Sequence, residues 1–269
     1  HHGRQPVLQQ PLAVVRRKAT RFGSGGAPAC ASPAAVRNWR HMSGTSSALP
    51  ARPLAWSLLP DDWRAVCGEE GWPLFRARQI WEWLHVRRAA AWPEMSSLPV
   101  GLRERLAARF DLWPWLSTEE RRSADGVVKL LLAARDGETA EAVLIPSGGR
   151  LTLCVSTQSG CAFGCVFCAT GRGGPGRDLD AGEIVGQLAA AAARAAPRRI
   201  THVVFMGMGE PLANYEGTLR AVRIINDADG IGIGARRITI STCGVVPGIR
   251  RLAGEGLQVE LSVSLHAPD

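Results

Sequence analysis

Apolar residues in the first part of the chain recur at the three- and four-residue spacings of amphipathic helices. In RARQIWEWLH, one helical face carries Ile80, Trp81 and Leu84. Apolar residues then recur every fourth position over residues 102–110, which predicts another helix. All nine tryptophans lie before residue 116. We therefore expect a small helical accessory domain over residues 58–115.

The pattern changes in the second part of the chain to short apolar runs, which are typical of strands. Two such runs flank the pair Asp136-Gly137, so we expect a β-hairpin linker element within residues 116–150. From Thr152 onward, strand-like segments alternate with helical ones. We expect strands at residues 151–156, 202–207, 237–242 and 259–266, and helices at residues 181–195, 218–226 and 246–254.

Continuous apolar strands separated by helices indicate parallel βα units. The expected fold class is α/β, with about four strands of a partial barrel over residues 151–269. The last expected strand ends just before Asp269, and no helix follows to cover it. We therefore expect the barrel to be truncated at its C-terminal end.

The composition of the amino-terminal segment sets it apart from the rest of the chain. Residues 1–60 contain eight Arg or Lys and no Asp or Glu, although the whole chain has 32 basic and 24 acidic residues. The rest of the chain is formally neutral, so the net charge of +8 does not by itself indicate a nucleic-acid partner. Residues 1–57 have the composition of an organelle transit peptide, although a disordered tail or a stretch upstream of Met42 is an alternative. No run of eighteen apolar residues predicts a membrane span.

Four of the seven cysteines lie within fifteen residues. An odd number of bunched cysteines favours metal binding in a reducing compartment over a disulfide framework. Cys161, Cys165 and Cys168 form C-x3-C-x2-C after an expected strand, a spacing that can hold three corners of a four-iron cluster and leave one iron free. A structural zinc with Cys154 as fourth ligand is the alternative, although zinc usually takes two C-x2-C pairs.

Polar motifs close the later strands, and strand ends of a parallel barrel converge on one mouth. These motifs are GMGEPLANY (residues 207–215), STCG (241–244) and SLH (264–266). Within STCG, we interpret Cys243 as a small buried loop residue. GRGGPG (171–176) has the letters of a dinucleotide fingerprint but does not follow a strand, so we interpret it as a mobile glycine loop.

The region from about Leu58 to Asp269 resembles radical S-adenosylmethionine (SAM) enzymes of the RlmN/Cfr type, which are RNA adenine methyltransferases. The motifs that carry the resemblance are CVSTQSGCAFGCVFCATG, FMGMGEPLANY, RRITISTCGVVPGI, LSVSLHAPD and FRARQIWEWLH. The cysteine motif alone would imply only the radical SAM superfamily, whereas the combination is specific to this type. The resemblance implies a (β/α)6 radical SAM barrel and an accessory domain that binds RNA.

The resemblance also implies the cofactors and their ligands. Cys161, Cys165 and Cys168 would hold a [4Fe–4S] cluster whose open iron binds SAM. Gly209 and Glu210 match the contact with the amino end of SAM. The residues that match further SAM contacts are Ser241, Ser264, Leu265 and His266. Glu141 matches the proton-accepting glutamate, and Cys154 matches the nearer of two mechanistic cysteines.

The implied activity is methylation of C2 of an adenine in large-subunit ribosomal RNA, with transfer RNA as a second candidate substrate. In the family, one SAM methylates a cysteine near the C-terminus, a second SAM yields the radical that activates this methyl group, and a nearby cysteine releases the product through a disulfide. The methylated cysteine lies beyond the fourth strand in the family, so we expect this chain to be incomplete for turnover. Two alternatives stay open: a C8-specific adenine methyltransferase, and a zinc-stapled RNA-binding module without catalysis.

The resemblance further implies an external electron donor such as ferredoxin or flavodoxin, a monomer, no membrane association and a cytoplasmic location. The acid-free amino end leaves a plastid or mitochondrion open as the location.

Overall fold

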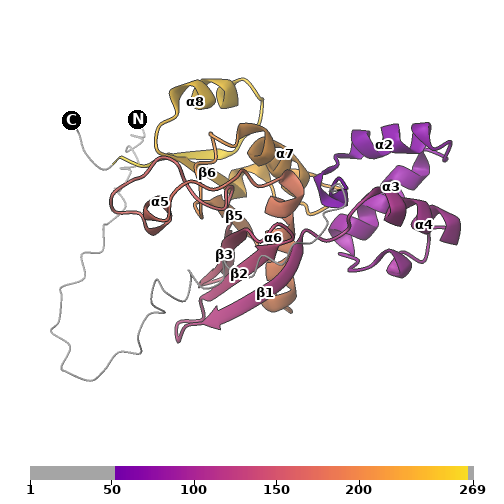
Figure 1. The fold of residues 1–269 in the computed structure, drawn as a ribbon, viewed down its shortest axis with the longest axis horizontal. Helices are drawn as coiled ribbons and strands as arrows, with labels where there is room; N and C mark the ends of the chain where they lie inside the picture. Colours follow the sequence, from indigo (N-terminus) through magenta and orange to yellow (C-terminus); the bar gives the residue numbers. More distant parts are fainter. Residues whose placement is uncertain (1–51, 266–269) are drawn as a thin grey trace, which may run out of the picture. The chain divides into compact units, whose positions relative to one another are not determined.

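The computed structural model describes residues 52–265 (Figure 1). Most of the expected N-terminal extension and the candidate SAM ligand His266 lie outside the described residues. The fold begins before the expected boundary at residue 57, because Ala55 and Trp56 are fully buried in the core. The amide of Ala55 donates a hydrogen bond to the carbonyl of Asp111 at 2.9 Å, which ties the start of the fold to the end of the helical domain.

The helical domain is built around the apolar faces that the sequence predicts. Ile80, Trp81 and Leu84 are all buried, as expected from their spacing. The predicted helix of residues 76–85 ends in a π-helical turn, a variant of the helix that its periodicity does not reveal. The helices are η2 (Ala55–Ser57), α2 (Pro60–Glu69), α3 (Phe75–Trp81), the π-helix η3 (Glu82–Val86), η4 (Trp92–Glu94) and α4 (Val100–Arg109).

A single seven-stranded sheet follows, in the order β1-β2-β3-β4-β5-β6-β7. Its first four strands are antiparallel and its last four are parallel, with β4 common to both parts. The strands are β1 (Trp115–Arg122), β2 (Val128–Ala134), β3 (Thr139–Ser147), β4 (Arg150–Cys154), β5 (His202–Phe205), β6 (Ile238–Thr242) and β7 (Glu260–Val263). The expected hairpin is β2–β3, and it continues directly into the parallel strands instead of forming a separate linker. β1 was not expected from the sequence.

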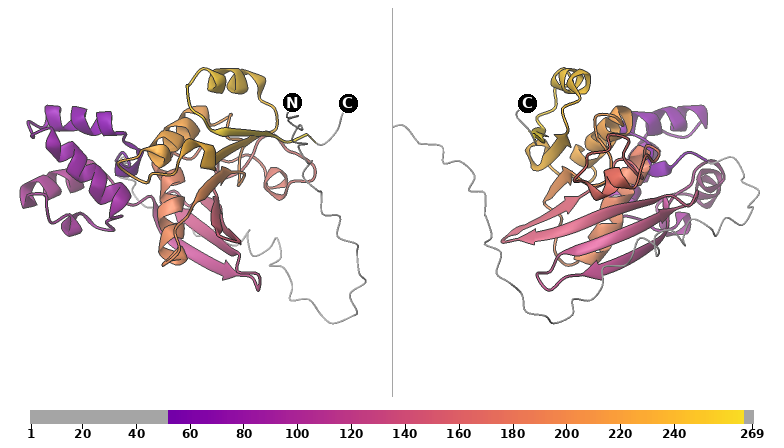
Figure 2. Two further views of the ribbon diagram at one scale, coloured as in Figure 1. Left: turned by 180° about the vertical axis from the view of Figure 1, so that it is seen from behind. Right: turned by 60° about the vertical axis from the view of Figure 1, so that its left-hand side comes forward.

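Helices lie between the parallel strands, as expected for βα units. They are α5 (Ala169–Arg172), α6 (Ala181–Ala195), α7 (Tyr215–Asn226) and α8 (Val246–Ala253), with the short η5 (Ala235–Arg237) before β6. Helix α6 packs against α7 and against β1 and β3, so α6 covers one side of the sheet with α7 beside it (Figure 2).

Alternation along the strands separates the two faces of the sheet. One row of neighbouring residues, Leu144, Leu153, Val203 and Ile238, is fully buried on the side of the helices. The adjacent row, Val143, Cys154, Val204 and Thr239, is half-buried on the opposite face. This second face corresponds to the interior of the partial barrel, and it carries the candidate residue Cys154.

Helix α3 and the π-helix enclose a histidine whose titration is testable. His85 is fully buried between Trp56 and Trp81, with ring centroids 5.1 and 4.0 Å away. Among residues 52–265, its two ring nitrogens have no hydrogen-bond partner. Burial lowers the pKa of His85 to about 3. The folded protein therefore keeps this ring neutral over a pH range in which the unfolded chain binds a proton.

We predict that His85→Phe reduces the dependence of stability on pH. As the pH falls from 6.5 toward 3, only the unfolded chain binds the proton, so the free energy of unfolding falls by about 1.4 kcal/mol per pH unit. Between pH 7 and pH 5 the wild-type protein should lose about 2 kcal/mol more than His85→Phe. Urea denaturation at both pH values measures the difference, and His202→Asn, at a half-buried position, is the control. An equal pH dependence in the wild type and His85→Phe would contradict the prediction.

Candidate functional site

The three candidate cluster ligands lie in the long loop between β4 and α6. Cys161, Cys165 and Cys168 are free thiols and are all half-buried. The amide of Cys168 donates to the carbonyl of Cys165 at 2.9 Å, and the amide of Cys161 donates to the carbonyl of Gly174 at 3.0 Å. These backbone contacts fold the loop so that all three thiols belong to one compact segment.

Glycines allow this loop to pack against itself. A Cβ atom on Gly160 would lie 2.5 Å from the amide nitrogen of Gly176, and one on Gly171 would lie 3.0 Å from the amide nitrogen of Cys165. The GRGGPG segment thus packs directly on the cysteine loop, and its end residues are required there as glycines. These close backbone contacts seat the segment against the cysteine loop, while its mobility stays a prediction.

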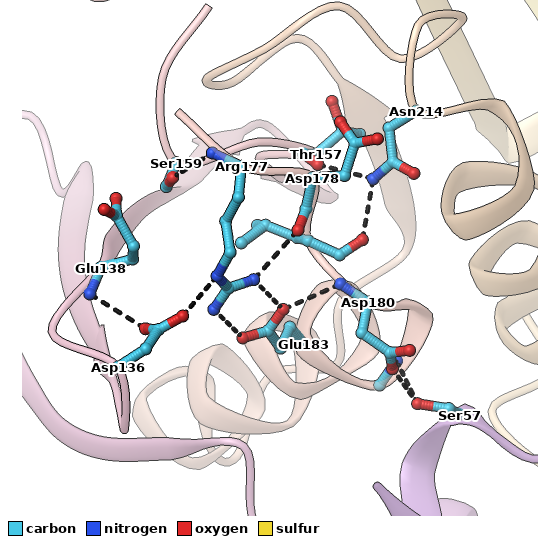
Figure 3. Close-up of polar contacts among 12 residues, drawn as sticks. Ser57, Asp136, Glu138, Thr157, Ser159, Arg177, Asp178, Asp180, Glu183 and Asn214 are labelled. Atoms are coloured by element: carbon cyan, nitrogen blue, oxygen red, sulfur yellow. Dashed lines mark hydrogen bonds and ion pairs between the residues drawn. The ribbon is translucent and has the colours of Figure 1, made fainter. Parts of the chain in front are cut away.

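An ion pair between the half-buried Arg177 and the buried Glu183 anchors the end of the loop to α6 (Figure 3). Arg177 makes two hydrogen bonds to Glu183, at 2.7 and 2.8 Å, and its Nε atom contacts Asp136 in the β2–β3 turn. The hydrogen bonds to Glu183 raise the pKa of Arg177 above its ordinary value. Glu183 also accepts from the amide of Asp180, completing a capping box at the start of α6. Arg177 therefore joins the cysteine loop, the hairpin turn and a helix start.

Glu210 connects the motifs at the ends of β5 and β6. Its side chain is 4% exposed, and its Oε2 atom accepts from the amide of Cys243 at 2.8 Å. Its own amide donates to Oε1 of Gln158, in the cysteine loop, at 2.9 Å. Gly209 before it has a φ of +95°, and a Cβ atom there would lie 2.6 Å from Gln158. The cysteine loop, the GMGEPL motif and the STCG motif therefore meet at the same end of the sheet, as their positions after successive strands predict.

The next candidate SAM contacts lie beside this point. The hydroxyl oxygens of Ser241 and Ser264 are 3.4 Å apart, across the ends of β6 and β7. Leu265 is exposed. The structure thus brings Ser241 and Ser264 together, and Leu265 directly follows Ser264 in the chain.

The environment of Cys243 differs from the one that we expected. We predicted a buried loop residue, but Cys243 is exposed, so that prediction is wrong. The desolvation of its thiol, followed by a hydrogen bond and the charge of Glu210, raises the pKa of Cys243 to about 11. The thiol remains protonated at neutral pH, and it lies next to the meeting point of the three motifs.

Cys154 and Glu141 share the half-buried face of the sheet. Cys154 on β4 pairs with Val143 on β3, and Glu141 lies two residues away on the same face. Burial raises the pKa of the Cys154 thiol. The carboxylate of Glu141 forms an ion pair with Lys129 on β2, with a distance of 2.6 Å between Oε1 and Nζ. The structure therefore places both candidate catalytic residues on neighbouring strands of one face.

The two metal centres that the sequence suggests, a four-iron cluster and a zinc ion, require different arrangements of the cysteine thiols. Within residues 52–265, no group of three or more His, Cys, Asp or Glu side chains lies close enough to hold a common metal ion. A zinc site with Cys154 would require such convergence. A four-iron cluster takes each thiolate on a different iron, so three thiols of one loop need not converge on a single ion to hold it.

Several residues at this site were not identified from the sequence. Gln158 and Asn214 lie inside recognised motifs, but their roles depend on contacts across the fold. Asn214 donates to the carbonyls of Thr157 and Leu179, at 2.7 and 2.8 Å, and so closes the base of the cysteine loop. Lys129 could have been found from strand alternation in the hairpin, which places it on the same face as Glu141.

Comparisons with known proteins agree with this geometry. Residues 155–269 match the Radical SAM superfamily, and residues 61–112 match the ribosomal RNA large subunit methyltransferase N-terminal domain. Residues 155–269 therefore form a radical SAM domain. Because this domain is joined to the RlmN-type N-terminal domain, the chain belongs to the RlmN-type family of radical SAM proteins.

Individual relatives are similar over most of this chain. The probable dual-specificity RNA methyltransferase RlmN of Moorella thermoacetica is 50% identical over 218 residues, which are 78% of this chain and 62% of the relative. The dual-specificity RNA methyltransferase RlmN of Anaeromyxobacter dehalogenans is 49% identical over 200 residues, or 72% and 54% of the two chains. A crystal structure of a radical SAM methyltransferase from Sphaerobacter thermophilus superposes with a TM-score of 0.77 at 47% identity, covering 81% of this chain and 64% of that one. The chain thus spans less than two thirds of the length of these relatives.

We predict that Arg177→Met destabilises the protein by about 3 kcal/mol, because it leaves the buried Glu183 carboxylate without its partner. Arg122→Met is the matched control, since Arg122 pairs with Glu120 at the surface and should cost less than about 1 kcal/mol. Urea denaturation measures both values. Equal losses in the two variants would show that Arg177 does not anchor the loop.

Proposed function

We propose that this chain is the cofactor-binding part of an enzyme that methylates C2 of an adenine in large-subunit ribosomal RNA, with transfer RNA as a further substrate. The observation that carries the proposal is the meeting of three motifs at one end of the sheet. There, Gln158 of the cysteine loop holds the amide of Glu210, and Glu210 holds the amide of Cys243.

Cys161, Cys165 and Cys168 would hold a [4Fe–4S] cluster with one iron open to the amino and carboxylate groups of SAM. When bound, the cluster and SAM supply the one-electron chemistry that an adenine C2 carbon requires, since this carbon is not nucleophilic. Gly209 and Glu210 would contact the amino end of SAM. Further contacts would come from Ser241, Ser264, Leu265 and His266. In support, Glu210 is held by two backbone amides, which orient its carboxylate before any ligand arrives.

Two residues of this chain would then take part in proton transfer and in disulfide formation. Glu141 would accept a proton from the adenine ring, and its carboxylate lies beside the positive charge of Lys129. Cys154 would act as the nearer of two mechanistic cysteines and form the disulfide that releases the product. Its raised pKa keeps it a thiol at neutral pH, so it would react only when a base removes its proton.

The partners follow from this chemistry. The enzyme would need RNA and an external one-electron donor such as ferredoxin or flavodoxin, and we propose that it acts as a monomer. The proposed location is the cytoplasm, with a plastid or mitochondrion as the alternative. In the described part of the chain, the helices are too short or too polar to cross a bilayer.

We predict that the protein reconstituted with iron and sulfide without oxygen binds about four iron atoms per chain. After reduction it should cleave SAM. Serine replacements of Cys161, Cys165 or Cys168 should lose iron and SAM cleavage, because each removes one corner of the cluster. Cys243→Ser is the matched control and should keep the iron. Iron and sulfide analysis measures the outcome, and a colourless protein with one zinc per chain would refute the proposal.

Cys154→Ala separates the cluster from the zinc alternative. We expect this variant to keep all of its iron, because Cys154 lies on the strand face and not in the cysteine loop. A zinc-stapled module would instead lose its metal, since Cys154 would be the fourth ligand. Metal content of the purified variant decides between the two.

A further inference from the structure

A small cavity lies where the helical domain meets the core. Its volume is about 180 Å³, and its lining contains three arginines and no acidic residue. Arg88 comes from the segment after the π-helix, and Arg198 and Arg199 come from the segment that leads into β5. Apolar side chains, including Leu188 and Ile233, form the rest of the lining.

The charges around this cavity are not balanced by the protein. Arg88 and Arg199 line the same cavity, and partial burial, followed by repulsion from the charge of Arg199, lowers the pKa of Arg88. In the described part of the chain, neither of them forms a hydrogen bond or an ion pair with a carboxylate. The neighbouring Arg87, by contrast, pairs with Glu82 at 2.8 Å. An anion in the cavity would remove this repulsion.

The backbone at Arg88 supports a role for its side chain. Arg88 has a φ of +56°. Among residues 52–265, no other residue except glycine has a positive φ. It follows the end of the π-helix at Arg87, a position where a left-handed residue is usually glycine. Glycine would suit the backbone better, so the fold alone gives no reason for an arginine here.

We propose that Arg88, Arg198 and Arg199 form a cleft that binds a backbone phosphate of RNA, an assignment that rests on the proposed function for its ligand. Guanidinium groups match phosphate oxygens through paired hydrogen bonds. Arg198 is already oriented, because its Nη2 atom donates to the carbonyl of Arg150 at 3.1 Å.

The location fits a positioning contact. The cleft lies at the amino end of β5, and Glu210 follows its carboxyl end. A phosphate held there would contact both the helical domain and the core, and would fix the RNA relative to both without reading its sequence. Free inorganic phosphate has the same chemistry as a backbone phosphate, so the test must distinguish binding of RNA from binding of inorganic phosphate.

The test uses the full 269-residue chain and a fluorescent RNA stem-loop, with affinity measured by anisotropy over a series of salt concentrations. Arg88→Gly and Arg199→Gln should each weaken binding several-fold. Each should also reduce the slope of log K against log salt by about 0.7 to 0.9, the value for one lost phosphate contact. Arg250→Gln, an exposed arginine on α8, is the matched control and should change neither quantity. The Tm of Arg88→Gly should equal or exceed that of the wild type, which separates lost binding from lost folding.

Three outcomes would overturn the inference. If the wild type binds the stem-loop and both variants match Arg250→Gln, the cleft does not contact RNA, and the proposed function is unaffected. If inorganic phosphate raises the Tm of the wild type but not of Arg88→Gly, while RNA affinity is unchanged, the cleft binds small anions only. If the wild type binds no RNA, the assignment fails as well. SAM cleavage by the same wild-type sample reports separately on the proposed function.

Discussion

The ion pair between Arg177 and Glu183 is the contact on which the arrangement of the candidate site depends. The cysteine loop is rich in glycine and has little side-chain packing of its own. Besides the backbone contacts within the loop, its two ends are held by side chains, since Asn214 binds its backbone and Arg177 connects it to α6 and to the hairpin turn. Because Glu183 is 6% exposed, the carboxylate end of this pair is largely shielded from solvent, whereas Arg177 is half-buried. The loop can then present three thiols while its own backbone stays mostly without regular structure.

The sheet provides the second level of organisation. Its buried face packs on the helices, and its half-buried face presents polar groups from neighbouring strands. Cys154, at the end of β4, lies at the boundary between the loop and this face. The antiparallel strands thus extend the surface of the parallel strands and bring Glu141 to it. Strand pairing, together with the hydrogen bonds of Gln158 and Glu210, thus brings together motifs that lie far apart in the sequence.

The sequence predicts the elements that local rules control. Helix α6 begins and ends where expected, because Asp180 caps it and its interior is rich in alanine and other apolar residues. Strand β1 was not predicted, since nearly all of its residues after Trp115 are exposed and polar and show no alternation. The contacts of Arg177 and Glu210 also could not be predicted, because their partners lie far away in the sequence. The left-handed backbone of Arg88 was missed for another reason, since arginine carries no local signal for that conformation.

Strand pairing in the hairpin also restricts which lengths this region can have. Cys154 and Glu141 reach the same face only because β3 and β4 keep one register, and side chains alternate between faces at every residue. An insertion or deletion of a single residue within β3 would turn Glu141 toward the helices. The turn at Asp136 is restricted as well, because Arg177 binds it. Length variation among natural variants should therefore concentrate at the turn between β1 and β2, where a change moves neither residue.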